Sequence, residues 1–449
     1  MPFFYTQSTK TTKQKEAIPM KRFSTILSLL LAVLLVFTSC AALAEAPVEK
    51  HVVFLTTITP EQAGYQTIEA LVKAYQEEVN PGFTMEMQYI ADKPSYLQKV
   101  KTLAASGELP DMFNVDADPY ANVLLENGLL QDLTGLVNEN KLDEIFYAAP
   151  LAWGRSSTGV QIAIPINYSM EVFWYNKAMF AEAGVEIPKT FDDFLAACAK
   201  LKGAGFTPIS VAGKEQWTLL RYVDMVTYKY GDNQWLFDLA RNKGSFSDEV
   251  GVRGAQFLAE LGQYFQAGFA NADYTSALEY FVGGNAAIYY MGTWDLNYFQ
   301  NDRLSEAMQD NIDYFLLPTV NEGDTEVGKA QFFAMSEMPI GFGTANFDKE
   351  MERFIIYYAN NISRFTTSSF SCAVGGTLPY DTDMVNRLAK DMEGSVGAIN
   401  IYDAELDPTT NELIGNLAIS LALGDITVED FASQVDASID ENYADYFAD

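Results

Sequence analysis

The sequence contains few of the residues on which metal sites, disulfide frameworks and histidine-based catalysis depend. Its 449 residues include three cysteines and a single histidine, His51. Three cysteines are too few for a disulfide framework, and the spacing of Cys40, Cys198 and Cys372 resembles no metal site. One histidine near the expected mature N-terminus argues against a histidine-based triad and a histidine-ligated zinc site. We therefore expect no metal and no cofactor.

The sequence also lacks the short motifs of common enzymes. It contains no G-x-S-x-G, no P-loop, no H-E-x-x-H and no dinucleotide fingerprint after a strand. A glycosidase needs only two carboxylates about 5–10 Å apart, and 60 acidic residues make such a pair uninformative. The prediction is binding without turnover. An exported carbohydrate-active enzyme is the alternative from another functional class.

Basic residues are scarce, because 60 acidic residues face 29 basic ones and the formal net charge is −31. Residues 1–44 contain five basic residues and one acidic residue, so the rest of the chain carries about −35. Such a surface repels nucleic acid and anionic lipid, which we exclude as partners. The charge keeps an exported protein soluble and says little about a neutral ligand.

Long apolar runs are limited to Ile26–Phe37, which is too short to span a bilayer comfortably. Met20-Lys21-Arg22 precedes this run as the basic start of an export signal, so Met20 is the expected initiation site. Phe37-Thr38-Ser39-Cys40 resembles a lipobox that would make Cys40 the lipidated first residue, whereas Ala42-Leu43-Ala44 fits ordinary cleavage. Both alternatives predict export, either to the outer face of the cytoplasmic membrane or into the medium.

Strand and helix patterns alternate after the export signal. Buried-type strands are predicted at 52–56, 84–89 and 111–115, with helices at 60–80 and 95–105 between them. This alternation indicates a doubly wound, mostly parallel sheet, in which ligands meet the loops at the carboxyl ends of the strands. The loop after the third strand is Asp116-Ala117-Asp118.

Two later motifs carry a resemblance to a known family. The first runs through Pro165, Tyr175-Asn176-Lys177, Ala183-Gly184, Pro188 and Thr190-Phe191-Asp192-Asp193-Phe194. Thr190, with Asp193 three residues later, is also an N-cap pattern for a helix to about Lys202. The second motif combines Phe281, Gly284, Ala286-Ala287 and Gly292-Thr293-Trp294. Together they resemble the extracellular family 1 solute-binding proteins of bacterial ABC importers, the group that includes maltose-binding protein.

The resemblance implies a two-lobed α/β fold of the periplasmic-binding-protein type, with a ligand cleft at the hinge and a mostly parallel sheet flanked by helices in each lobe. We expect one lobe from 45–168 and 318–375 and another from 169–317 and 376–449, with strands at Ile312–Leu317 and Phe332–Phe342 returning to the first lobe. The implied function is a monomeric, extracytoplasmic subunit that captures a sugar or oligosaccharide and delivers it to a membrane permease.

Sugar rings require aromatic plates for their faces and polar groups for their hydroxyls. Trp294 follows a predicted strand beside Gly292 and Asp295, and the resemblance implies that it stacks on sugar; the alternative is a core tryptophan. Trp217, in a glycine-containing loop after a strand, is a second platform candidate. Trp153, Trp174 and Trp235 are interpreted as packing residues.

Polar ligand-binding candidates complete the expected site. The resemblance places a sugar-binding carboxylate at Asp118, with Asp116 nearby, although either residue could instead cap a helix or lie in a solvated loop. It also implies a contacting acid where this chain has Ser169, so Tyr168 or Glu171 would substitute, and it adds Gly376 in the Gly375–Pro379 turn. Asp116, Asp118 and Glu171 also suit a polyamine, which is the alternative ligand within the same class. The sequence does not identify the sugar or its chain length.

Overall fold

The computed structural model describes residues 47–156, 158–300, 304–305, 307–321, 332–336, 338–393 and 399–447. The predicted export signal, including Met20, Cys40 and Ala42-Leu43-Ala44, lies outside the described residues. Residues from Glu49 onward belong to one compact unit. Within the described ranges, no helix is long and apolar enough to cross a membrane.

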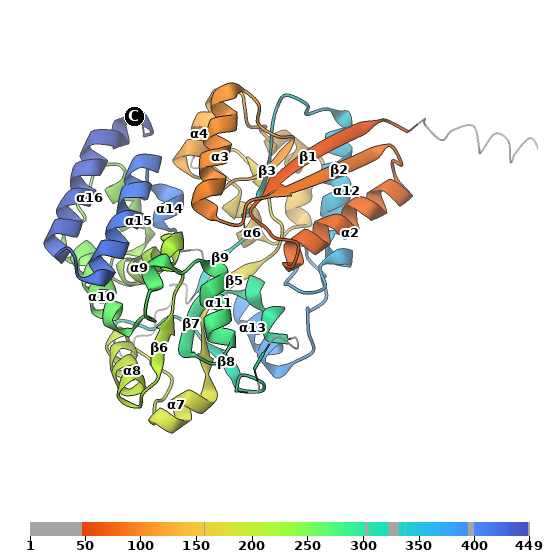
Figure 1. The fold of residues 1–449 in the computed structure, drawn as a ribbon. Coiled ribbons are helices and arrows are strands. Elements are labelled where there is room, and N and C mark those ends of the chain that lie inside the picture. Colours follow the sequence, from red (N-terminus) through yellow and green to blue (C-terminus); the bar gives the residue numbers. More distant parts are fainter. Residues whose placement is uncertain are drawn as a thin grey trace, which may run out of the picture. The chain divides into compact units, whose positions relative to one another are not determined.

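The first of two sheets contains the three strands predicted at the start of the chain. Its order is β2-β1-β3-β10-β4, with β1 parallel to β2 and β3, and β10 antiparallel to β3 and β4 (Figure 1). The strands are β1 Lys50–Thr56, β2 Phe83–Tyr89, β3 Met112–Asn114, β4 Ala163–Ile164 and β10 Ile340–Phe342.

Helices cover both faces of the first sheet because neighbouring β1 side chains point to opposite sides. Val52 and Phe54 pack with the helices α2 (Ala63–Glu78) and α12 (Lys349–Phe365). Leu55 packs on the other face with α3 (Lys93–Ser106) and α4 (Pro119–Glu126). Further helical segments here are α5 Thr134–Glu139, η2 Leu142–Glu144 and α6 Ala148–Trp153. This arrangement leaves the carboxyl ends of β1, β2 and β3 at one shared edge.

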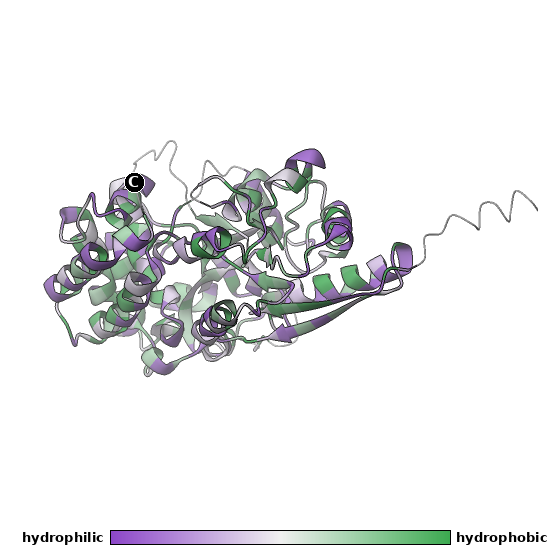
Figure 2. Cartoon of the chain, turned by 90° about the horizontal axis from the view of Figure 1, so that it is seen from above, coloured by the Kyte–Doolittle hydropathy of each residue, from purple (hydrophilic) through white to green (hydrophobic). Residues whose placement is uncertain are grey.

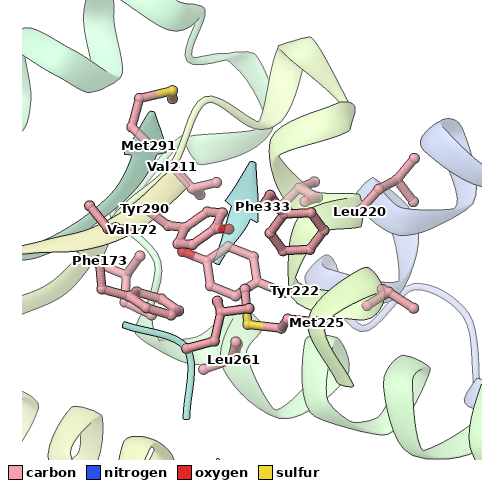
Figure 3. Packing of buried hydrophobic residues seen from close by; sticks show 14 of the residues in the cluster. Val172, Phe173, Val211, Leu220, Tyr222, Met225, Leu261, Tyr290, Met291 and Phe333 are labelled. Carbon is pink, nitrogen blue, oxygen red and sulfur yellow. The ribbon is translucent and has the colours of Figure 1, made fainter. Parts of the chain in front are cut away.

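The second sheet is built around β5 (Ser169–Asn176), which is antiparallel to β7, β8 and β9. Its order is β6-β7-β5-β8, and β6 is parallel to β7. The other strands are β6 Thr207–Ser210, β7 Ala286–Gly292, β8 Ile312–Phe315 and β9 Phe333–Met335. Phe173 of β5 lies in a large aromatic cluster with Tyr222, Tyr290 and Phe333 nearby (Figure 3).

The helices around the second sheet come from distant parts of the chain, and α13 to α16 contribute to the same hydrophobic core as β5 and β7. In Figure 2, hydrophobic and hydrophilic residues occur together along the helices, as expected for amphipathic helices. The α-helices are α7 Lys177–Ala183, α8 Phe191–Gly203, α9 Trp217–Ala240, α10 Glu249–Leu261, α11 Tyr274–Val282, α13 Asp383–Glu393, α14 Tyr402–Glu405, α15 Pro408–Leu423 and α16 Val428–Asn442. Short 3-10 helices are η3 Gly213–Glu215, η4 Gly262–Tyr264, η5 Phe269–Asn271, η6 Thr293–Asp295, η7 Tyr298–Gln300 and η8 Tyr443–Asp445.

The α/β fold class is confirmed, but one detail of the prediction is wrong. Each sheet is mostly parallel, as predicted, because four of the five strands described in it share one direction and a single strand, β10 in the first sheet and β5 in the second, runs against them. A strand at Ile312 does not return to the first lobe, since β8 and β9 both pair with β5, whereas β10, further along the chain, joins the first sheet. An apolar run identifies a buried strand but does not determine its direction or its partner, which depend on long-range pairing.

The helix α8 begins with the predicted N-cap. The Thr190 hydroxyl accepts a hydrogen bond from the Asp193 amide at 3.1 Å, and the Asp193 carboxylate accepts one from the Thr190 amide at 3.1 Å. These reciprocal bonds form a capping box, which satisfies backbone donors that the first turn of a helix leaves free.

Thr190→Ala should lower the free energy of unfolding by about 0.5–2 kcal/mol, because the Asp193 amide loses its acceptor. Chemical denaturation monitored by circular dichroism measures this difference. Thr190→Ser keeps the hydroxyl and is expected to remain close to the wild type. Equal stability of the alanine variant and the wild type would contradict the role of the cap.

Candidate functional site

A cavity of about 1010 Å³ lies between loops of the first sheet and elements of the second. Loops that follow β1, β2 and β3 contribute Thr57, Thr59, Asp92, Lys93 and Asp116. The second sheet and its helices contribute Glu171, Lys214, Glu215, Trp217, Arg221, Tyr274, Trp294, Tyr298, Met335 and Asp403. The site therefore lies at the predicted edge, where the carboxyl ends of the parallel strands meet.

Aromatic side chains form part of the cavity wall. Trp217, at the start of α9, and Trp294, just after β7, lie with their ring centroids 6.3 Å apart and their planes at 61°. Trp153 and Tyr298 also line the cavity. Trp294 is only 8% exposed, so its ring both packs in the core and lines the cavity. A Cβ at Gly292 would overlap the Trp294 ring, which explains the glycine at the end of β7.

A network of buried ion pairs adjoins the cavity and contributes side chains to its lining. The Arg221 guanidinium donates to Glu171 at 3.1 Å, Asp224 at 3.2 Å and Asp403 at 2.7 Å. It also lies 5.2 Å from the centre of the Trp217 ring, one turn earlier on α9. The Arg221, Glu171 and Asp224 side chains are at most 3% exposed. Mutual pairing allows these charges to be buried.

Lys93 extends the network toward the first sheet. Its ammonium donates to Asp116 and to Asp403, each at 3.1 Å. Burial alone would lower the pKa of Lys93, but these two carboxylates raise it above its ordinary value. Asp403 is buried too, yet Arg221 and Lys93 hold its pKa well below its usual range. Both residues therefore remain charged at neutral pH.

The pKa of the Glu171 carboxyl shifts in the direction opposite to that of Asp403. Burial raises the pKa of the Glu171 carboxyl, and Arg221 only partly opposes this effect. Two cations, Lys93 and Arg221, serve four carboxylates in the network, so burial of the excess negative charge favours protonation. Asp116 and Glu171, two of the three acids that suit a polyamine, are thus already bonded within the chain.

Four predicted ligand-binding residues line the cavity: Asp116, Glu171, Trp217 and Trp294. The structure brings them together from the loop after β3, from β5, from α9 and from η6. Their roles in binding stay predictions.

The other predicted carboxylates perform structural tasks. Asp118 is the N-cap of α4, where its Oδ1 accepts a hydrogen bond from the Ala121 amide at 2.7 Å, the alternative that the sequence left open. Asp295 is fully buried and accepts hydrogen bonds from the hydroxyls of Tyr274 and Tyr289. Because Tyr274 lines the cavity, the hydrogen bond to Asp295 positions a lining residue, although Asp295 itself is not part of the lining.

The remaining predicted residues do not line the cavity. Tyr168 packs against Tyr147, and its amide donates to the Phe370 carbonyl at 3.0 Å. Ser169 is buried at the start of β5 opposite Met335. Gly376 packs against Ser371, where a Cβ would be too close. Gly292 contributes through the contact of its backbone with the Trp294 ring.

Several lining residues are missing from the sequence prediction. Arg221 follows Trp217 by four residues, and the two share a face because α9 begins at Trp217, which the sequence analysis placed in a loop. Trp153, which the sequence analysis assigns to packing, lines the cavity. Lys93 and Asp403 are 310 positions apart, and no local pattern connects them.

Comparison with known proteins identifies the family. The family model described as bacterial extracellular solute-binding protein matches residues 59–343. The chain belongs to this family. A multiple sugar-binding protein of Streptococcus mutans is 26% identical over 243 residues, which cover 51% of this chain and 54% of that protein. A probable sugar-binding periplasmic protein of Mesorhizobium japonicum is 28% identical over 294 residues, covering 64% of this chain and 65% of that protein. The aligned part thus spans about half to two thirds of these relatives.

Solved structures share the fold. A chitin oligosaccharide binding protein superimposes with a TM-score of 0.77 at 20% identity, covering 89% of this chain and 99% of that one. The raffinose complex of the solute-binding protein RafE gives a TM-score of 0.65 at 17% identity, with 87% and 99% coverage. The family and the fold are therefore those of extracellular binding proteins.

Replacing Trp217 by alanine should weaken sugar binding by about 30- to 1000-fold, because a desolvated aromatic contact is worth roughly 2–4 kcal/mol. Trp294→Ala should weaken binding similarly and also cost about 3–5 kcal/mol of folding stability, because most of this ring is buried. Calorimetric affinity and melting temperature are measured on each preparation. Trp235→Ala, a half-buried tryptophan outside the cavity lining, is the control that should leave affinity unchanged. Normal affinity in folded Trp217→Ala protein would remove this residue from the site.

Stability should depend on pH through Asp118. Burial, supported by the nearby Asp116 charge, raises the pKa of Asp118 to about 7, although the Ala121 amide opposes this shift. An unfolded aspartate has a pKa of about 3.9, so the folded state binds the extra proton and this contribution to stability disappears as the pH rises from about 4 to about 7. Asp118→Asn keeps the cap and should have a flatter melting temperature across this window. Parallel profiles for the two proteins would contradict the shift.

Proposed function

We propose that the protein is the extracytoplasmic solute-binding subunit of an ABC importer and that its cavity captures a sugar or oligosaccharide. The observation that carries this proposal is the pair of indole rings, Trp217 and Trp294, in a cavity that also presents carboxylates and a guanidinium. The indoles offer apolar plates to sugar ring faces, and the polar groups suit hydroxyls. Relatives that are named as sugar-binding proteins support the same ligand class.

A polyamine is less well supported as the ligand. Its recognition needs carboxylates with free negative charge, whereas Asp116 and Glu171 are engaged by Lys93 and Arg221. An exported enzyme is also less well supported, because the family is one of binding proteins.

The proposed mechanism is closure of two lobes around the ligand. One lobe would comprise about 45–168 and the part of the chain from β10 to about 375, and the other would hold the second sheet with 376–449. A ligand that touches both lobes only in the closed form shifts the population toward that form. The closed form would then be recognised by a permease. The protein would act as a monomer, lipidated at Cys40 or cleaved after Ala44.

A thermal-shift panel of neutral mono- and oligosaccharides, polyamines and amino acids tests the proposal. A cognate sugar at about 100 times its dissociation constant should add about 2.7 kcal/mol to stability. Calorimetry should then give saturable binding, and mass spectrometry should recover the sugar unchanged. A shift with polyamines alone, or conversion of the sugar to products, would overturn the proposed function.

A further inference from the structure

Charged contacts across the cavity converge on two consecutive residues, Asp92 and Lys93, at the start of α3. The Lys214 ammonium from η3 lies 3.1 Å from the Asp92 carboxylate. Lys93 itself reaches Asp403 on α14 at 3.1 Å. The helix α3 packs on the first sheet, whereas η3 and α14 belong with the second. Both ion pairs therefore join elements on opposite sides of the cavity.

Two hydrogen bonds to or from the backbone reinforce this junction. The carboxylate of Glu215, a buried residue of the cavity wall, accepts a hydrogen bond from the backbone amide of Lys93. Asn297, after β7, donates to the backbone carbonyl of Glu61 at 3.2 Å. Three side chains from the opposite side of the cavity therefore hold the start of α3. Lys214 pairs with Asp92, Asp403 pairs with the Lys93 ammonium, and Glu215 accepts from the Lys93 amide.

The basic residues of the cavity lining are paired with carboxylates of the chain. Three basic residues occur among the lining residues that the structure describes: Lys93, Lys214 and Arg221. Each is bonded to at least one carboxylate of the chain. A ligand carboxylate or phosphate would have to compete with these partners while facing the surrounding acids, which is an unfavourable like-charge arrangement.

We propose that Asp92 and Lys93 form a charged latch that holds the two sides of the cavity together before ligand arrives, and that the site therefore takes carbohydrates without carboxylate or phosphate groups. The assignment to carbohydrates without acidic groups rests on the proposed function, whereas the latch does not. The cations serve closure, and the aromatic walls are left to receive the ligand.

Small-angle scattering of the ligand-free protein tests the latch. Raising NaCl from about 0.01 M to about 1 M shortens the Debye length from about 30 Å to about 3 Å. The radius of gyration should increase with salt in the wild type, because screening favours the separated charges of an open form. Lys214→Met should already show the larger radius at low salt, since Lys214 is half exposed and its loss leaves the cores intact.

Lys141→Met is the matched control, because Lys141 pairs with Glu144 on a single side, away from the cavity lining. It should follow the wild type at every salt concentration. An identical radius for wild type and Lys214→Met at low salt would overturn the latch.

Acidic sugars test the ligand class separately. Galacturonate, glucuronate and digalacturonate at millimolar concentration should produce no thermal shift. Saturable binding of any of them would overturn the assignment to uncharged sugars while leaving both the latch and the proposed function in place. Failure of every sugar would instead count against the proposed function, and with it the assignment to uncharged sugars, while leaving the latch in place.

Discussion

The buried guanidinium of Arg221 is the interaction on which the site depends. A charge removed from water costs several kcal/mol unless partners compensate for it. Here the compensation comes from Glu171 on β5, Asp224 on α9 and Asp403 on α14, which are far apart in sequence. The requirement to satisfy one cation therefore fixes the positions of a central strand, a long helix and a C-terminal segment relative to one another.

This network also determines what the cavity presents to a ligand. Lys93 shares Asp403 with Arg221 and adds Asp116, so the charges form a continuous chain from one side of the cavity to the other. Lys93 and Arg221 are therefore paired with Asp116, Glu171 and Asp403 of the chain itself. The indole rings add apolar surface to the lining, and the Arg221 guanidinium lies against the ring of Trp217. Electrostatics and aromatic packing thus have separate tasks in one site.

Buried residues next to the cavity lining also position its aromatic side chains. Gly292 leaves space for the Trp294 ring, and Asp295, three positions after Gly292, accepts hydrogen bonds from Tyr274 and Tyr289. A buried carboxylate needs such donors to remain satisfied. The short segment after β7 therefore orients one aromatic residue directly and a second through a hydrogen bond. A sequence motif at the end of a strand locates such a segment. It does not tell which of its side chains face a ligand and which face the core.

The sequence by itself determined the family, the α/β class, the parallel strands β1 to β3, the capping box of α8 and the two tryptophans of the cavity wall. These features depend on local patterns: apolar runs, caps, turn glycines and motif spacing. It misassigned the strand that returns to the first sheet, because strand pairing joins residues far apart in the chain. Only the tertiary structure decided that Asp118 caps a helix, that Asp295 lies behind the wall, and that Lys93 meets Asp403. An ion pair across 310 positions has no local signature, since folding alone brings its members within hydrogen-bonding distance.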